Sequence, residues 1–268
     1  MERMAVEIKD VWKSYDGERY VLRGVSMKIP QKDMVLIRGR SGTGKSTLLN
    51  LIGCIDTPTK GSIIIEGQET GRMGEKELAY LRLHRIGIVF QTHNLLSDLT
   101  VFENIMLPLS IAKSRLAEVR VKELLETFEL QDIADKKPDE ISGGEEQRAA
   151  IARAMANNPS ILLADEPTAS LDLKNSENVL ETFKKVNREF ETTVIISSHD
   201  PLVDSYVPKT YYMRDGQLFM EKRGICAACG EAIIDKNYMI CSSCGATYHM
   251  ECGYKLESCV ICGKKRGE

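Results

Sequence analysis

The sequence has no long apolar run. Its most apolar stretches, at residues 86–90, 161–164 and 194–196, are far shorter than the roughly 20 residues that a membrane-spanning helix needs. The N-terminal segment, MERMAVEIKD, also lacks the apolar centre of a secretory signal peptide. We therefore expect a cytoplasmic protein that lies at the inner face of the cell membrane only through a membrane partner.

Neither positively nor negatively charged residues are in large excess. The chain carries 36 Lys and Arg against 39 Asp and Glu, so no global positive field draws it to nucleic acid or anionic lipid. We expect no nucleic-acid partner. The apolar share of 43% is that of an ordinary globular protein, and 268 residues suffice for one large domain and a small one.

Cysteine is nearly absent from most of the chain. Cys54 stands alone, whereas the other seven cysteines crowd between Cys226 and Cys262 in Cys-x2-Cys pairs. In a cytoplasmic protein this pattern favours metal ligation over disulfides. The composition changes at Lys-Arg-Gly, residues 222–224, which predicts a first domain over 1–223 and a second over 224–268.

Short apolar runs alternate with longer helical patterns in the first domain. Strands are expected at 6–11, 25–29, 35–37, 63–65, 86–90, 161–164 and 194–197. Helices are expected from Gly44 onward, at 75–83, through most of 101–156 and at 173–190, and a hairpin is expected to turn at Asp215-Gly216. This alternation implies an α/β fold with a largely parallel sheet and a helical insert.

Residues 39–46, Gly-Arg-Ser-Gly-Thr-Gly-Lys-Ser, match the GxxxxGK[ST] pattern of a P-loop and lie between a strand pattern and a helix pattern. Glycines there let backbone N–H groups point at a phosphate, and the helix dipole adds to the attraction. Lys45 would reach the β and γ phosphates, and the Ser46 hydroxyl would bind Mg²⁺. A chance glycine-rich turn is the alternative. The ATP-binding residues expected here are Gly39, Arg40, Ser41, Gly42, Thr43, Gly44, Lys45, Ser46 and Thr47.

Two carboxylates follow the apolar run 161–164. Asp165 would hold Mg²⁺, and Glu166 would act as general base toward the attacking water. Asp-Glu after a strand is otherwise a solvated turn, but its place downstream of a P-loop favours catalysis. His199 follows the run 194–197, where open α/β sheets bind ligands, and could hydrogen-bond the γ-phosphate or the water. A lone histidine is otherwise structural, which is how we interpret His84 and His93.

A second glycine-rich helix start occurs at Ser142-Gly143-Gly144 and is another candidate anion site. A serine N-cap followed by a tight turn is the competing interpretation. One chain would then carry two phosphate-type sites but one lysine-bearing loop. Two copies arranged head to tail would resolve this mismatch, since each would supply Ser142 to the nucleotide of the other.

Together these motifs resemble the nucleotide-binding domain of ABC transporters, a P-loop NTPase fold with a helical subdomain. Their order is that of the family: P-loop, Q-loop at Gln91, signature Ile-Ser-Gly-Gly-Glu at 141–145, Asp165-Glu166, D-loop at 170–172 and switch histidine His199. The resemblance implies an ATPase that forms a homodimer around ATP and drives an integral-membrane permease.

The resemblance also implies roles for single residues. Ser142 and Gly144 of one subunit would face Lys45 of the other. The implied nucleotide contacts of the signature and D-loop are Ser142, Gly143, Gly144, Glu145 and Asp172. The implied Mg²⁺ ligands are Ser46, Gln91 and Asp165, and the implied catalytic residues are Glu166, His199, Lys45 and Gln91. Tyr15 is the implied aromatic on adenine, with Trp12 and Tyr20 as rivals.

The runs at 51–61, 88–91 and 94–96 are similar to the lipoprotein-releasing and macrolide-export branch of the family. Permeases of that branch have few spans and large extracytoplasmic domains. The chain departs from the common pattern at Ile141, where Leu is usual, and at Glu145, where many members have Gln. Neither change removes a phosphate, Mg²⁺ or water contact.

Eight possible metal ligands end the sequence in four pairs: Cys226, Cys229, Cys241, Cys244, His249, Cys252, Cys259 and Cys262. Eight ligands equal two closed, structural Zn²⁺ sites. The segment is too poor in aliphatic residues to fold unaided, and metal binding worth roughly 10–16 kcal/mol per site would supply the missing stability.

The ligand order resembles RING and PHD-like fingers, which are cross-braced. This implies Cys226, Cys229, His249 and Cys252 at one zinc, and Cys241, Cys244, Cys259 and Cys262 at the other. Two sequential ribbons, with the first four ligands on one zinc and the last four on the other, are the alternative. The His249-x2-Cys252 spacing favours the cross-brace. An iron–sulfur cluster is a third possibility, but ferredoxin spacing is absent.

Three functions are compatible with these patterns. The leading one is a transport ATPase that closes around two ATP, with the zinc domain as a docking or regulatory module. A soluble ABC ATPase in repair, translation or cluster assembly is second, but the long coiled-coil insertion or second ATPase domain of such proteins is missing. A binding module or ubiquitin-type ligase acting through the finger is third, and it rests on analogy alone.

Overall fold

The structure is a computed structural model that describes residues 3–92, 94–220, 226–230, 238–241, 243–244 and 246–265. The expected domain boundary at 222–224 and His93 lie outside these residues. The strands are β1 (Met4–Ser14), β2 (Tyr20–Pro30), β3 (Met34–Arg38), β4 (Lys60–Ile65), β5 (Gln68–Glu69), β6 (Ile86–Val89), β7 (Ile161–Asp165), β8 (Thr193–Ser198), β9 (Lys209–Arg214), β10 (Gln217–Met220), β11 (Tyr238–Ile240) and β12 (Thr247–His249). The helices are α1 (Lys45–Ile52), α2 (Glu75–His84), α3 (Val101–Ile111), α4 (Ala117–Thr127), α5 (Gly143–Ala154), α6 (Leu173–Glu189), α7 (Pro201–Asp204) and α8 (Met250–Lys255).

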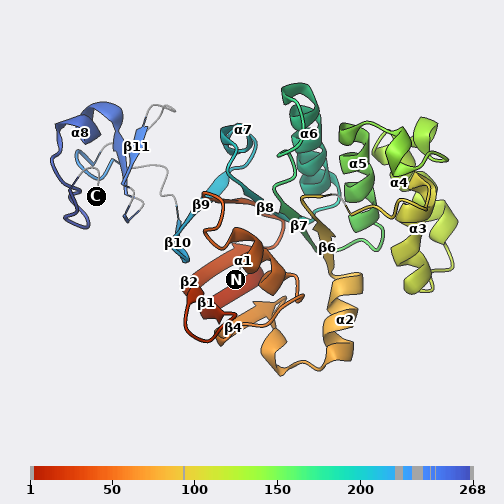
Figure 1. The fold of residues 1–268 in the computed structure, drawn as a ribbon, viewed down its shortest axis with the longest axis horizontal. Coiled ribbons are helices and arrows are strands. Elements are labelled where there is room, and N and C mark those ends of the chain that lie inside the picture. The colour runs from red at the N-terminus through yellow and green to blue at the C-terminus, as the bar shows by residue number, and fades with distance from the viewer. Residues whose placement is uncertain are drawn as a thin grey trace.

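A six-stranded sheet in the order β10-β9-β3-β8-β7-β6 is the centre of the fold (Figure 1). Neighbouring strands from β9 to β6 run parallel, and only β10 pairs antiparallel, through the hairpin at Asp215-Gly216. The strands expected at 35–37, 86–90, 161–164 and 194–197 are therefore all in this sheet. Because β3, β8, β7 and β6 run in the same direction, their carboxyl ends gather at one edge, where ligands of such sheets bind.

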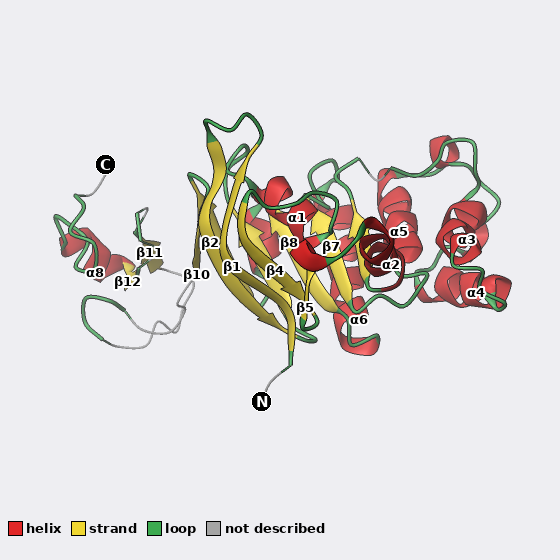
Figure 2. Ribbon diagram, turned by 90° about the horizontal axis from the view of Figure 1, so that it is seen from below, coloured by secondary structure: helices red, strands yellow, loops and turns green. Residues whose placement is uncertain are grey.

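The first strands do not join that sheet. β1 pairs antiparallel with both β2 and β4, and β5 completes a separate four-stranded sheet in the order β2-β1-β4-β5. The expectation of one largely parallel sheet was thus too simple. Helix α1 contacts strands of both sheets and lies between them, as Figure 2 shows.

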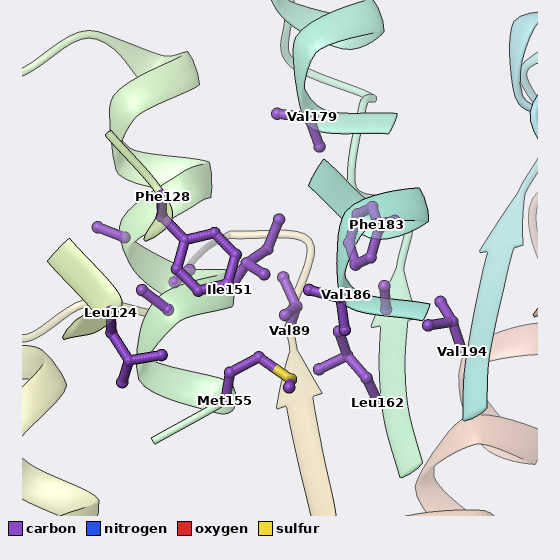
Figure 3. Close-up of a cluster of buried hydrophobic side chains, with 14 of the residues drawn as sticks. Val89, Leu124, Phe128, Ile151, Met155, Leu162, Val179, Phe183, Val186 and Val194 are labelled. Atoms are coloured by element: carbon purple, nitrogen blue, oxygen red, sulfur yellow. The ribbon is translucent and has the colours of Figure 1, made fainter. Parts of the chain in front are cut away.

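Two apolar cores occupy opposite faces of the six-stranded sheet. Alternate residues of one strand point to opposite faces, so Val35 and Ile37 of β3 pack with α1 and the antiparallel sheet. Met34 and Leu36 pack instead into the core shared with α5 and α6. Figure 3 shows part of this second core, with side chains from sheet strands facing side chains from three helices: Val89, Leu124, Phe128, Ile151, Met155, Leu162, Val179, Phe183, Val186 and Val194.

Helices α3, α4 and α5 form the expected helical insert and lie at one end of the sheet (Figure 2). Helix α3 begins with a capping box, in which the Thr100 side chain accepts from the Glu103 N–H and the Glu103 carboxylate accepts from the Thr100 N–H. Among the described residues, no helix combines the length and apolar character that crossing a membrane requires.

Candidate functional site

The P-loop connects β3 to α1 at the carboxyl edge of the six-stranded sheet. Gly42 and Gly44 have φ of 78° and 104°, left-handed values that glycine adopts without strain. Gly44 is the N-cap of α1, so the loop delivers its backbone to a helix N-terminus. This is the strand, loop and helix context that a phosphate-binding loop requires.

Lys45 is the first residue of α1, and its side chain is only 5% exposed. Its ammonium donates to the carbonyls of Gly39 and Arg40 at 2.8 and 3.2 Å. It also lies 3.0 Å from Oε1 of Glu166. A buried charge requires such partners. The cation is therefore held over the loop and against the carboxylate that follows β7.

Glu166 is fixed by backbone and side-chain contacts. Its φ of 47° is unusual for a residue other than glycine, and its N–H donates to the Ser197 carbonyl at 2.9 Å. Nδ1 of His199 lies 2.9 Å from Oε2. Burial alone would raise the pKa of Glu166, but hydrogen bonds from Lys45 and His199 outweigh it and lower this pKa below its ordinary value. The carboxylate is therefore ionised at neutral pH.

Asp165 ends β7 beside this carboxylate. The hydroxyl of Ser197, on neighbouring β8, donates to its Oδ1. Gln91 follows β6 on the other side of β7 and is exposed, as is Ser46 in the first turn of α1. The role of Ser197 was not foreseen, although its place in the strand before His199 could have indicated it. Oxygen ligands of this kind, a carboxylate, a hydroxyl and an amide, suit Mg²⁺.

The signature segment is both an N-cap and an exposed helix start. The Ser142 hydroxyl accepts from the Glu145 N–H, and Glu145 Oε2 accepts from the Ser142 N–H at 2.8 Å. Hydrogen bonds from Ser142 lower the pKa of Glu145. Ser142 and Gly143 are exposed. In the described residues, the hydrogen bonds of Ser142 remain within this turn and do not reach Lys45.

The first turn of α6, directly after the D-loop, packs on the signature segment. A Cβ on Gly144 would lie 2.6 Å from Oδ1 of Asn175, so a larger residue there would require the Asn175 side chain to move. The side chain of Asp172, the N-cap of α6, accepts from the N–H of Asn175 and from its amide, both at 2.8 Å. The starts of α5 and α6 therefore lie together, and Asn175 joins them.

The three candidate adenine-binding aromatics differ in surroundings. Trp12 and Tyr20 pack edge to face on each other, with ring centroids 5.2 Å apart. Tyr15 is 64% exposed. Of these rings, that of Tyr15 is therefore the most accessible for stacking.

The cysteine-rich segment brings its eight candidate ligands into two groups. The groups are Cys226, Cys229, His249 and Cys252, and Cys241, Cys244, Cys259 and Cys262, with ligand atoms of each within 4.8 Å of one another. This is the cross-braced arrangement, not the sequential one. A Zn–S bond of about 2.3 Å places tetrahedral sulfurs about 3.8 Å apart. Cys241–Cys262 at 3.7 Å and Cys244–Cys259 at 3.5 Å fit that size.

A groove of about 330 Å³ lies between the sheet and the helical insert and was not expected from the sequence. It is lined by residues of α2, β6, α3 and α5 and by the segment after β6. The amide of Asn157 donates to the carbonyls of Leu83 and Pro108 at 3.0 and 3.1 Å, and so joins the two walls. Arg153 donates to the Asn94 carbonyl at 2.6 Å. These contacts fix a concave surface next to Gln91.

Comparisons with known proteins agree with this geometry. The ABC transporter family model matches residues 22–169. The lipoprotein-releasing system ATP-binding protein LolD of Geobacter metallireducens is 43% identical over 218 residues, which are 80% of this chain and 97% of LolD. The macrolide export ATP-binding/permease protein MacB of Syntrophobacter fumaroxidans is 40% identical over 227 residues, which are 82% of this chain but 32% of MacB.

A solved structure of the ATP-binding cassette MJ0796 from Methanocaldococcus jannaschii is also similar. It is a dimer in a post-hydrolysis state with bound ADP and Pi. Its sequence is 43% identical, the match covers 80% of this chain and 96% of the cassette, and the TM-score is 0.73. The P-loop, the convergence of Lys45, Glu166 and His199, and these matches agree: the chain belongs to the ABC transporter family, as an ATP-binding subunit that hydrolyses ATP.

Proposed function

We propose that two copies of this chain close around two ATP molecules and thereby drive a membrane permease. The observation that carries the proposal is the separation of two half-sites. Lys45, Glu166 and His199 form one at the sheet edge, whereas the exposed Ser142–Gly143 start of α5 forms the other. In a head-to-tail pair each half-site completes the other, and the dimeric form of the similar cassette supports this arrangement.

The contacts of Glu166 indicate how hydrolysis is gated. Lys45 pairs with the carboxylate at 3.0 Å, and a phosphate at the loop would compete for the same ammonium. Once Lys45 binds the phosphate instead, Glu166 can accept a proton from the attacking water. His199 stays within hydrogen-bond distance of the Glu166 carboxylate and so orients that group. Ser46, Gln91 and Asp165 would hold Mg²⁺, which neutralises developing phosphate charge. Tyr15 would stack on adenine.

Glu166→Gln tests this function. Removal of the general base should lower hydrolysis at least ~100-fold while ATP still binds, because the loop and Lys45 are intact. The ATP-bound dimer should then persist. Phosphate release gives the rate, and light scattering with Mg²⁺ and ATP gives the mass.

Glu181→Gln, at an exposed glutamate on α6 that pairs with Lys184, is the matched control and should hydrolyse ATP normally. Unchanged hydrolysis in the Glu166 variant contradicts its role as base. A variant that binds ATP but remains monomeric contradicts the closed dimer.

We also propose that the groove next to Gln91 receives a cytoplasmic segment of the permease. Its lining includes Phe90, Ile111 and Pro108, and Ile111 is 59% exposed, so apolar area is available to a partner. Gln91 follows β6, and β6 lines the groove. A permease segment bound in the groove would therefore lie next to a proposed Mg²⁺ ligand. This proximity would couple binding of the permease to the nucleotide.

Ile111→Asp should abolish co-purification with a multi-span partner from detergent-solubilised membranes, because a charge in the groove opposes apolar contact. Leu116→Asp is the matched control, since Leu116 is 69% exposed and does not line the groove. Equal recovery of the partner by both variants would show that the permease docks elsewhere. Recovery of non-membrane partners alone by the unaltered chain would contradict the transport function.

For the cysteine-rich segment we propose two structural Zn²⁺ ions in a module over 224–268 that docks a partner or regulates the ATPase. The support is the chemistry of the two ligand sets, four sulfurs in one and three sulfurs with a histidine nitrogen in the other. Both sets are closed by protein ligands, so neither leaves a position for a reacting water.

A further inference from the structure

We propose that Lys13 and Asp56 are positioning residues that hold Tyr15 in place for the base of the nucleotide. The inference rests on the proposed function, because it requires that Tyr15 stacks on adenine. It assigns a role to an ion pair that none of the nucleotide motifs contains.

Lys13 is a buried cation at the end of β1, only 8% exposed. Its ammonium lies 2.6 Å from Oδ1 of Asp56 and donates to the carbonyl of Thr57 at 2.9 Å. Burial of a charge is costly unless it is paired in this way. Such a contact between residues 43 positions apart fixes the end of β1 to the segment that follows α1.

The same two residues contact Tyr15. The ammonium of Lys13 lies 4.8 Å from the centroid of the Tyr15 ring, within the range of a cation–π interaction. Burial would raise the pKa of Asp56, but Lys13, the Thr57 N–H and the Tyr15 hydroxyl outweigh it and lower this pKa. One face of the ring is thus covered by a cation, while Tyr15 as a residue is 64% exposed. The uncovered face is available to a purine.

Backbone contacts support the same attachment. The N–H of Thr59 donates to the Trp12 carbonyl at 2.8 Å, and the N–H of Ser14 donates to the Thr59 hydroxyl at 3.0 Å. The segment 56–59 follows α1, which begins at Lys45 in the P-loop. The ring for the base and the loop for the phosphates are therefore attached to opposite ends of one helix, and Lys13 with Asp56 sets the position of the ring.

The test compares Lys13→Met with the unaltered full-length chain, using ATP as substrate and inorganic tripolyphosphate as competitive inhibitor. Tripolyphosphate has no base, so it reports on the P-loop alone. Loss of the cation should raise KM for ATP roughly fivefold, the equivalent of about 1 kcal/mol of cation–π contact, with kcat within about twofold. The inhibition constant of tripolyphosphate should not change. Asp56→Asn should shift KM in the same direction, and Lys13→Arg should restore it.

Lys60→Met is the matched control, because Lys60 lies over the ring of Tyr20 at 5.6 Å. It should leave KM unchanged. A rise in KM with this variant alone would assign the base to Tyr20 and overturn the inference. Weaker tripolyphosphate binding in Lys13→Met, in proportion to KM, would overturn it as well, since Lys13 would then act through the P-loop helix. An unaltered chain that neither hydrolyses ATP nor binds tripolyphosphate would overturn the proposed function itself.

Discussion

At the scale of single residues, Lys45 and Glu166 are each other's partners. The ammonium is shared between two loop carbonyls and one carboxylate oxygen, and the second carboxylate oxygen lies against His199. The Glu166 carboxylate is thus ionised and paired on both oxygens. In the proposed mechanism, a bound phosphate would draw Lys45 away from Glu166 and free the oxygen that takes the proton, so nucleotide binding and activation of Glu166 would occur together.

Ser197→Ala removes the hydroxyl that donates to Asp165. A hydrogen bond to a charged group contributes about 1.5–3 kcal/mol. If Asp165 binds Mg²⁺ as proposed, loss of this hydrogen bond would leave it less well oriented toward the metal. We expect the Mg²⁺ concentration for half-maximal hydrolysis to rise about tenfold. A titration of ATPase activity with Mg²⁺ measures this change.

Ser160→Ala is the control, since Ser160 lies just before the other end of β7 and its hydroxyl donates to the Arg85 carbonyl at 3.3 Å. It should leave the Mg²⁺ dependence unaltered. If the two variants give the same curve, Ser197 does not orient the metal ligand.

At the scale of elements, the sequence predicts the P-loop strand and helix, the helical insert and the hairpin correctly because each depends on local patterns. Which strands pair with one another depends instead on contacts between segments that are distant in the sequence. β1 and β4 lie side by side although many residues separate them, and no periodicity reveals that contact. The separate antiparallel sheet could not be predicted for this reason.

The candidate site shows the same limit. Motif spacing identifies Lys45, Glu166 and His199 as members of one site, because each follows a strand of the parallel sheet. It does not reveal that Ser197 supports Asp165, that Asn175 joins the starts of α5 and α6, or that Lys13 pairs with Asp56. These contacts depend on tertiary packing between residues that carry no motif.

Helix α6 offers a direct test of the second core. Phe183 is 0% exposed and packs between the sheet and the helices (Figure 3). Phe183→Ala should lower the free energy of unfolding by about 3–5 kcal/mol, because it removes buried apolar surface and leaves a cavity. Urea denaturation of the full chain measures the loss.

Leu173→Ala on the same helix is the comparison, since Leu173 is 66% exposed. Its effect on the free energy of unfolding should stay within about 0.5 kcal/mol. A similar loss of unfolding free energy in both variants would indicate that stability depends on formation of α6 rather than on burial of its apolar face.

At the scale of the whole molecule, the chain combines an ATPase fold stabilised by two apolar cores with a segment that has little apolar material of its own. In the cysteine-rich segment, Tyr248 is 3% exposed, and its hydroxyl lies 3.0 Å from the Cys259 sulfur. Its strands β11 and β12 pair over three residues each. Such a small sheet is marginal without help, and the two proposed metal sites would supply the missing stability.

Purified protein should therefore contain two Zn²⁺ per chain by elemental analysis. Removal of the metal with a chelator should expose residues 226–265 to protease while ATP hydrolysis by the remainder continues, since the two parts have separate sources of stability. Limited proteolysis with mass spectrometry, alongside phosphate release, measures both. A proportional loss of hydrolysis would show that the cysteine-rich segment is coupled to catalysis. A metal content near zero would contradict the proposed zinc sites.

Strand β3 contributes side chains to both apolar cores and leads directly into the phosphate-binding loop. Its even-numbered apolar residues face one core and its odd-numbered ones face the other, and the phosphate loop starts immediately after it. Insertion or deletion of a single residue in β3 would exchange the two sets and displace the loop in the same step. Surface connections that carry none of the site motifs can be lengthened, but this five-residue strand must keep its length, because it sets both the register of the interior and the position of the phosphate-binding loop.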